Sequence, residues 1–94
     1  MLALCHSAFM IREMPSSNLR LTLAEQIRLF RSKRGLSQEE LAFRAGLHRT
    51  YISLVERGKK SPTIDCLTRI SAALDVRASV LLAHAEKCAK GQRR

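Results

Sequence analysis

The chain has 94 residues, 46% of them hydrophobic, and carries 17 Lys and Arg against 8 Asp and Glu, a net charge of +9. This length allows one compact domain and excludes two, and the hydrophobic content excludes a disordered tail. The positive charge favours a polyanionic partner, nucleic acid first and an anionic membrane second. A basic surface that serves only solubility explains the charge about equally well.

The three cysteines, Cys5, Cys66 and Cys88, are scattered and form no CxxC pair. Because small secreted domains depend on dense disulfides, we expect reduced thiols and a cytoplasmic protein. No apolar run reaches membrane-spanning length, and the first residues do not resemble a signal peptide. His84 lies one helical turn from Cys88, but a zinc site usually has four ligands. We expect no metal, no cofactor, no membrane partner and, without a nucleophile motif or phosphate loop, no catalysis.

The chain divides into three stretches. Residues 1–20 are expected to form a flexible N-terminal arm, with a short added strand or a later translation start at Met10 or Met14 as alternatives. Residues 21–86 form the predicted domain. Residues 87–94 contain four basic groups and are expected to be a frayed tail.

Two capping boxes predict where the first two helices begin. Thr22-Leu-Ala-Glu25 and Ser37-Gln-Glu-Glu40 both fit S/T-x-x-E, in which side chains satisfy free backbone N–H groups. They predict helices over 23–34 and 38–45. The expected apolar stripes are Leu23, Ile27 and Phe30 in the first helix and Leu41, Ala42 and Ala45 in the second. Glycines that suit left-handed helix ends follow these helices and the next, at Gly35, Gly46 and Gly58.

Three further helices complete an all-α domain of five helices. One covers 49–57, and Thr63 caps the next. The last follows Arg77 and begins with Val80, Leu81 and Leu82. The expected stripe of the fourth helix is Ile64, Leu67, Ile70 and Leu74. No stretch alternates with period two between turn residues, so no sheet is expected.

The segment "LHRTYISLVERGKK", Leu47 to Lys60, is a helix with two different faces. At about 100° per residue, Ile52, Val55 and Glu56 share one face, and short polar residues occupy the opposite one. A helix that enters the major groove needs such a face, with an Arg that can bind a guanine edge. An ordinary amphipathic helix with a solvated face is the alternative. The candidate base-reading residues are Arg49, Thr50, Ser53 and Leu54.

The helix-turn-helix pattern and its flanks resemble a known family. "RSKRGLSQEELAFRAGLHRTYISLVERGKKSPTIDCLTRISAALDV", Arg31 to Val76, resembles the phage-repressor-like helix-turn-helix family of the Cro/C1 or XRE type. The combination G-L-S-Q-E-E-L-A, A-G-L, I-S-x-x-E-R-G and P carries the resemblance. The "HRTYIS" run is similar to the controller proteins of restriction–modification systems. The resemblance implies a five-helix, lambda-repressor-like DNA-binding domain encoded by a bacterium or phage.

The resemblance also implies roles for individual residues. Gln38 is expected to bind a phosphate and to steady the recognition helix, and Arg31 is expected to pair with Glu56. An unpaired buried Glu56 would be costly. The full set of expected phosphate contacts is Ser37, Gln38, Tyr51, Arg57, Lys59, Lys60 and Thr63.

Three residues depart from the family pattern. Asp75 stands where many members end the fourth helix with Gly, and Asp tolerates the left-handed conformation less readily. Arg77 replaces the usual cap of the fifth helix. Leu54 replaces a hydrogen-bonding residue of some members, which shifts the expected contact towards a thymine methyl group or plain packing.

Three consecutive apolar residues, Val80, Leu81 and Leu82, exceed what one core-facing stripe can bury. We expect part of this helix to form a two-fold interface, with completion of the monomer core as the alternative. The predicted function is a homodimeric, sequence-specific transcription regulator that binds a palindromic operator through the major groove. Repression would follow from blocking RNA polymerase and activation from contacting it. An antitoxin or another protein-interaction module is the competing hypothesis.

Overall fold

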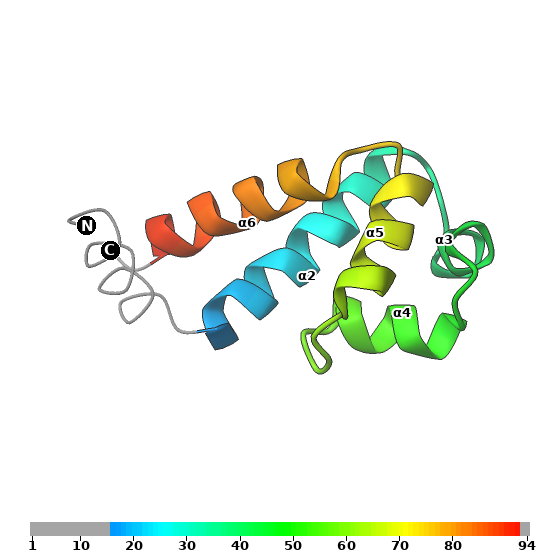
Figure 1. Cartoon of the computed structure of the whole chain (residues 1–94), viewed down its shortest axis with the longest axis horizontal. Helices are drawn as coiled ribbons and strands as arrows, with labels where there is room; N and C mark the ends of the chain where they lie inside the picture. Colours follow the sequence, from blue (N-terminus) through cyan, green and yellow to red (C-terminus); the bar gives the residue numbers. More distant parts are fainter. Residues whose placement is uncertain (1–15, 93–94) are drawn as a thin grey trace.

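The structure is a computed structural model that describes residues 16–92. These residues form five α-helices, as the sequence predicts (Figure 1). Their bounds are α2 Ser16–Lys33, α3 Gln38–Ala45, α4 Arg49–Glu56, α5 Ile64–Ala73 and α6 Ala78–Gln92. The predicted bounds of α3 are confirmed, and those of α4 differ by one residue at its end.

The first described helix, α2, begins well before the predicted position. Thr22 is not its cap but an interior residue that is 1% exposed, and its Oγ1 donates to the carbonyl oxygens of Asn18 (3.0 Å) and Leu19 (3.1 Å). A threonine in a helix can bond back to the preceding turn, so the motif alone does not mark a start. Residues 16–20 of the expected arm therefore belong to α2, and residues 1–15, which include the alternative starts Met10 and Met14, lie outside the described residues.

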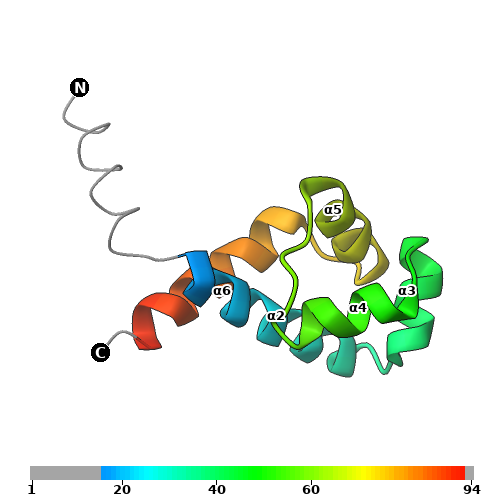
Figure 2. The same cartoon turned by 90° about the horizontal axis from the view of Figure 1, so that it is seen from below.

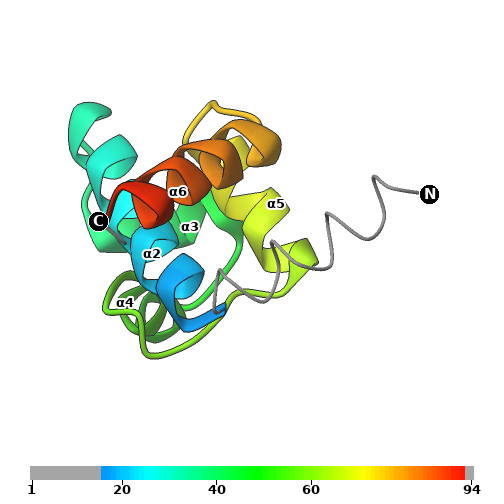
Figure 3. The same ribbon diagram turned by 90° about the vertical axis from the view of Figure 1, so that its left-hand side faces the viewer.

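The last helix, α6, extends through most of the expected tail. Its backbone is helical to Gln92, and Ala85 and Ala89 are both 0% exposed. These small side chains allow α6 to lie close against α2. The contact stabilises helical structure in a segment whose basic composition suggests fraying. Figures 1 and 3 show the two helices running side by side.

The core lies where α2 and α6 meet the compact group of α3, α4 and α5 (Figure 3). Most predicted stripe residues are buried in it, but Ile64 is 77% exposed because the first turn of α5 projects from the domain. The large aliphatic side chains with 0% exposure are Ile27, Leu41, Ile52, Ile70, Leu74 and Leu81.

Asp75, one of the residues that depart from the family pattern, lies just after the end of α5. Its φ of 60° places Asp75 in the left-handed region, where the resemblance implied that a glycine would be more favourable. Arg34 reinforces this end of the helix, because its Nε donates to the carbonyl oxygen of Leu74 at 2.8 Å. The turn therefore holds together across two elements despite its non-glycine residue.

Candidate nucleic-acid interface

The turn between α3 and α4 sets the direction of the candidate recognition helix. Gly46 has φ 70° at the end of α3, and the N–H of Leu47 donates to the carbonyl oxygen of Ala42 at 2.9 Å. This left-handed end reverses the chain within a few residues. The helix α4 therefore starts at Arg49 and lies across the bottom of the molecule as drawn in Figure 1.

The two faces of α4 separate as the helical periodicity predicts. Ile52 is 0% exposed, Val55 2% and Glu56 1%, so this face belongs to the core. The candidate base-reading residues lie on the other side: Arg49 and Thr50 are exposed, and Ser53 and Leu54 are half-buried. The exposed arginine lies in the first turn of α4, at the end nearest α3.

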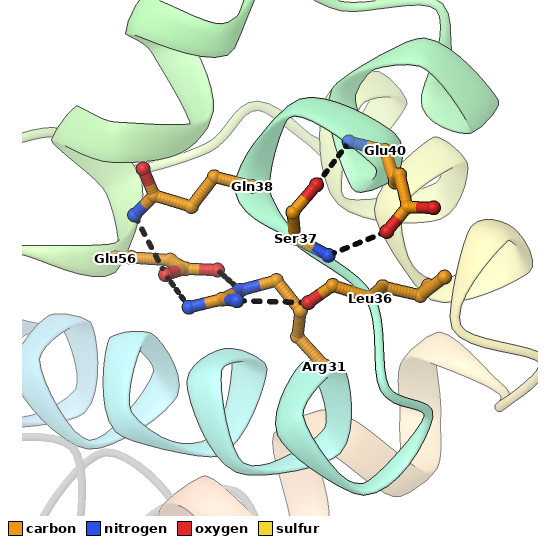
Figure 4. Close-up of polar contacts among 6 residues, drawn as sticks. All are labelled: Arg31, Leu36, Ser37, Gln38, Glu40 and Glu56. Atoms are coloured by element: carbon orange, nitrogen blue, oxygen red, sulfur yellow. Dashed lines mark hydrogen bonds and ion pairs between the residues drawn. The ribbon is translucent and has the colours of Figure 1, made fainter.

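A polar network fixes α4 against the start of α3 and the end of α2 (Figure 4). Arg31 Nε lies 2.6 Å from Glu56 Oε2 and Arg31 Nη2 lies 3.0 Å from Glu56 Oε1, which forms the expected ion pair. Gln38 Nε2 donates to the same Oε1 at 3.0 Å, and Arg31 Nη1 donates to the Leu36 carbonyl at 2.9 Å. These bonds compensate the buried Glu56 carboxylate and hold Gln38 beside α4.

The start of α3 is closed by the predicted capping box. The Glu40 N–H donates to Ser37 Oγ at 3.0 Å, and the Ser37 N–H donates to Glu40 Oε1 at 2.9 Å. The Ser37 backbone N–H lowers the pKa of the Glu40 carboxyl below its usual value. Because the Ser37 backbone N–H is already used, only its hydroxyl hydrogen remains for the phosphate contact predicted at this residue.

Cationic side chains follow the C-terminal end of α4. Arg57 is exposed, and its Nε makes a long 3.4 Å bond to the Ser53 carbonyl. Lys59 and Lys60 are also exposed in the loop that leads to α5. Thr63 accepts a hydrogen bond from the Cys66 N–H at 3.2 Å and caps α5 as predicted. The structure thus brings Arg57, Lys59 and Lys60 to the C-terminal end of α4, whereas Thr63 lies near Tyr51.

Tyr51 does not present its hydroxyl in the way that the predicted phosphate contact requires. The Tyr51 Oη is buried and makes no regular hydrogen bond among the described residues. Burial raises the pKa of Tyr51, and the nearby hydroxyls of Thr63 and Tyr51 lower the pKa of the Cys66 thiol. In this conformation Tyr51 faces α5, and its ring lies under the Lys60 ammonium at 5.9 Å. The correction arises because α5 covers the side chain from a distant part of the sequence.

The structure separates the three apolar residues of the predicted interface on α6. Leu81 is 0% exposed and belongs to the monomer core. Leu82 is partly buried against that core, and Val80 is 36% exposed. The helix turns these consecutive residues in different directions, so only Val80 and part of Leu82 remain for a partner.

Some contacts have no counterpart in the sequence interpretation. Arg20 Nε donates to the Gly58 carbonyl oxygen at 2.7 Å, which ties the loop after α4 to α2. Phe43 is 87% exposed on α3. Its position could have been read from the α3 periodicity, because Leu41, Ala42 and Ala45 take the inward side. The Arg20 contact joins residues 38 positions apart and leaves no local signal.

The described part of the chain contains neither a cluster of metal ligands nor a membrane-spanning helix. Within residues 16–92, no three His, Cys, Asp or Glu side chains gather as metal ligands. None of the described helices combines the length and apolarity that a membrane crossing requires.

Comparison with known proteins identifies the family. The helix-turn-helix family model matches residues 27–81. The control protein C.BamHI of Bacillus amyloliquefaciens is 46% identical over 68 residues, which are 71% of this chain and 84% of that protein. The clp gene regulator ClgR from Corynebacterium glutamicum superposes with a TM-score of 0.76 at 29% identity and 80% coverage of both chains.

A third relative has been solved with DNA. The restriction–modification controller protein C.Esp1396I, a tetramer in complex with its natural 35 base-pair operator, matches with a TM-score of 0.67 at 35% identity. The match covers 73% of this chain and 91% of that chain. The family consists of transcription regulators rather than enzymes. This chain therefore belongs to the XRE-type helix-turn-helix family of DNA-binding transcription regulators.

Proposed function

We propose that the protein is a controller-type regulator that binds a palindromic operator as a homodimer. The observation that carries this proposal is the division of α4, whose inner face is locked in the core while Arg49 and Thr50 face outward. The similarity to C.BamHI and to the operator-bound C.Esp1396I supports it. A protein of this kind acts on bacterial or phage DNA in the cytoplasm.

Each exposed group on α4 has a chemical role in this proposal. The Arg49 guanidinium can bind a guanine edge with two hydrogen bonds, and the Thr50 and Ser53 hydroxyls can bond to either base. Leu54 is half-buried, so its outer methyl groups can contact a thymine methyl. Positioning on the phosphates falls to groups around α4, namely Ser37, Gln38, Arg57, Lys59, Lys60 and Thr63.

The homodimer supplies the second half of the recognition. One α4 reads only a few base pairs, whereas two copies related by a two-fold axis read half-sites about one helical turn apart. The net charge of +9 supports strong phosphate binding, which makes the affinity steeply dependent on salt. Binding over a promoter would block RNA polymerase, and binding beside it would allow a contact that activates transcription.

Selection of bound DNA from a random pool tests this function. We expect a palindromic consensus, and we expect Arg49→Ala to weaken binding at one guanine position by about 1–3 kcal/mol. Arg77→Ala removes another exposed arginine, from the turn between α5 and α6, and is the matched control. Equal binding of the wild-type protein to all sequences would contradict the proposal.

A second candidate function is protein interaction, as in an antitoxin. The exposed Phe43 favours it, because its ring is 87% exposed and aromatic side chains are enriched at protein interfaces. Phe43 borders an open pocket of about 480 Å³ with Glu39, Glu40 and Arg44. A Phe43→Ser variant that keeps its DNA consensus but loses a co-purifying partner would support this function. A variant that loses the DNA consensus alone would argue against it.

A further inference from the structure

A pocket of about 380 Å³ lies where α2 passes the C-terminal end of α4. Arg28 and Glu25 line it from α2, and Glu56, Arg57 and Gly58 line it from the end of α4. Sequence reasoning assigned no role to Arg28, because it lies on the outer face of a helix far from the helix-turn-helix motif. In the fold, Arg28 lines the same pocket as Arg57, which follows it by 29 positions in the sequence.

The charges around this pocket favour an anion. Arg28 and Arg57 are both exposed and both line the pocket, so two cationic side chains from different helices border one opening. Glu56 is already bonded to Arg31 and Gln38, so little of its charge is left unbalanced. The Gly58 carbonyl oxygen, which would repel an anion, accepts a hydrogen bond from Arg20. Glu25 is the one remaining carboxylate in the lining.

The pocket also lies on the side of the molecule that presents α4. Figure 2 views the molecule with α4 in front, and α2 runs past the end of α4 on that same side. A helix of 8 residues is about 12 Å long, close to the width of the major groove. With Arg49 in the groove, the other end of α4 reaches the groove edge, where the phosphates lie.

We propose that Arg28 and Arg57 together bind one backbone phosphate that flanks each half-site. This inference rests on the proposed function and adds a contact to it. A guanidinium binds a phosphate through two parallel hydrogen bonds, and two of them from different helices hold it from two directions. Because one comes from α2 and the other from the end of α4, the contact fixes the angle at which α4 enters the groove.

The salt dependence of operator binding tests the proposal. Arg28→Gln is compared with Arg77→Gln, which removes the same charge from an exposed position in the turn between α5 and α6. We expect Arg28→Gln to weaken binding about tenfold and to reduce the slope of log K against log salt by less than the value of about 0.9 for a whole phosphate contact, because Arg57 stays on that phosphate. Arg77→Gln should change both quantities much less. Glu25→Gln should strengthen binding relative to Glu86→Gln, because it removes the carboxylate from the pocket.

Ethylation of single DNA phosphates locates the contact. On the wild-type protein, ethylation of one flanking phosphate in each half-site should weaken binding, and on Arg28→Gln the same modification should cause a smaller loss, because only Arg57 still binds that phosphate. Equal slopes for Arg28→Gln and Arg77→Gln on an operator that the wild type binds specifically would overturn the contact alone. Failure of the wild-type protein to select any operator would overturn the proposed function and the contact with it.

Discussion

The carboxylate of Glu56 shows how one buried charge organises the DNA-binding surface. Its two oxygens accept from Arg31 and Gln38, so a single side chain joins the end of α2, the start of α3 and the end of α4. The position of every outward-facing residue on α4 therefore depends on a buried pair that does not itself lie on that face.

Loss of one partner of this pair should be more harmful than loss of both. Arg31→Met leaves the Glu56 carboxylate buried without its cation, and we expect the free energy of unfolding to fall by about 3–5 kcal/mol. The double variant Arg31→Met with Glu56→Leu should recover most of that loss, because no buried charge remains. Urea denaturation of the wild type, both single variants and the double variant measures this. A double variant no more stable than Arg31→Met would contradict the account.

At this scale the sequence predicts some residue positions and not others. Helical periodicity places Arg49, Thr50 and Ser53 outward, because it needs only the neighbouring turns of α4. The buried hydroxyl of Tyr51 and the core position of Leu81 were not predictable in this way. Both depend on which distant helix covers that side of the residue, and a local pattern carries no such information.

At the scale of whole elements, capping determines where α3 and α5 begin. The side chains of Ser37 and Thr63 each accept a hydrogen bond from the backbone N–H of the residue three positions later, as predicted. Thr22 matches the same motif yet lies inside α2, because the motif is equally compatible with a helix that started earlier. The sequence thus predicts a cap reliably where Gly35 or Pro62 interrupts the preceding chain, and less reliably where nothing does.

The cap of α5 should have a measurable effect on stability. Thr63→Ala removes the acceptor for the Cys66 N–H, and we expect a loss of about 1 kcal/mol in the free energy of unfolding. Thr68→Ala is the matched control, since its hydroxyl donates only to the Ile64 carbonyl within the helix. Alanine favours a helix interior, so this control should change little or become more stable. Thermal unfolding of both variants measures this effect. Equal losses of stability in the two variants would show that Thr63 is no more than an ordinary surface residue.

At the scale of the whole molecule, the proposed homodimer requires a surface that meets a second copy. Because Leu81 is buried, it cannot contact a second copy. The outer side of α6 around Val80 remains available for that contact. We expect Val80→Glu to weaken a homodimer about tenfold or more, because it places a charge in an apolar contact. Phe43→Glu, which changes a more exposed apolar residue on α3, should leave the dimer intact. Sedimentation velocity over a range of concentrations compares them, and an unchanged Val80→Glu dimer would place the interface elsewhere.

The pairing of α2 with α6 has a consequence for the synthesis of the protein. These helices come from opposite ends of the described chain, and Leu23 and Ile27 on α2 are buried in the same core as Leu81 and Ala85 on α6. On the ribosome, α2 emerges first and must wait for α6 before its apolar side is covered. The helix-turn-helix unit can form its local contacts meanwhile, but the domain reaches its final stability only after release of the last helix. A slowly translated chain would therefore expose the α2 stripe for longer and depend more on chaperones.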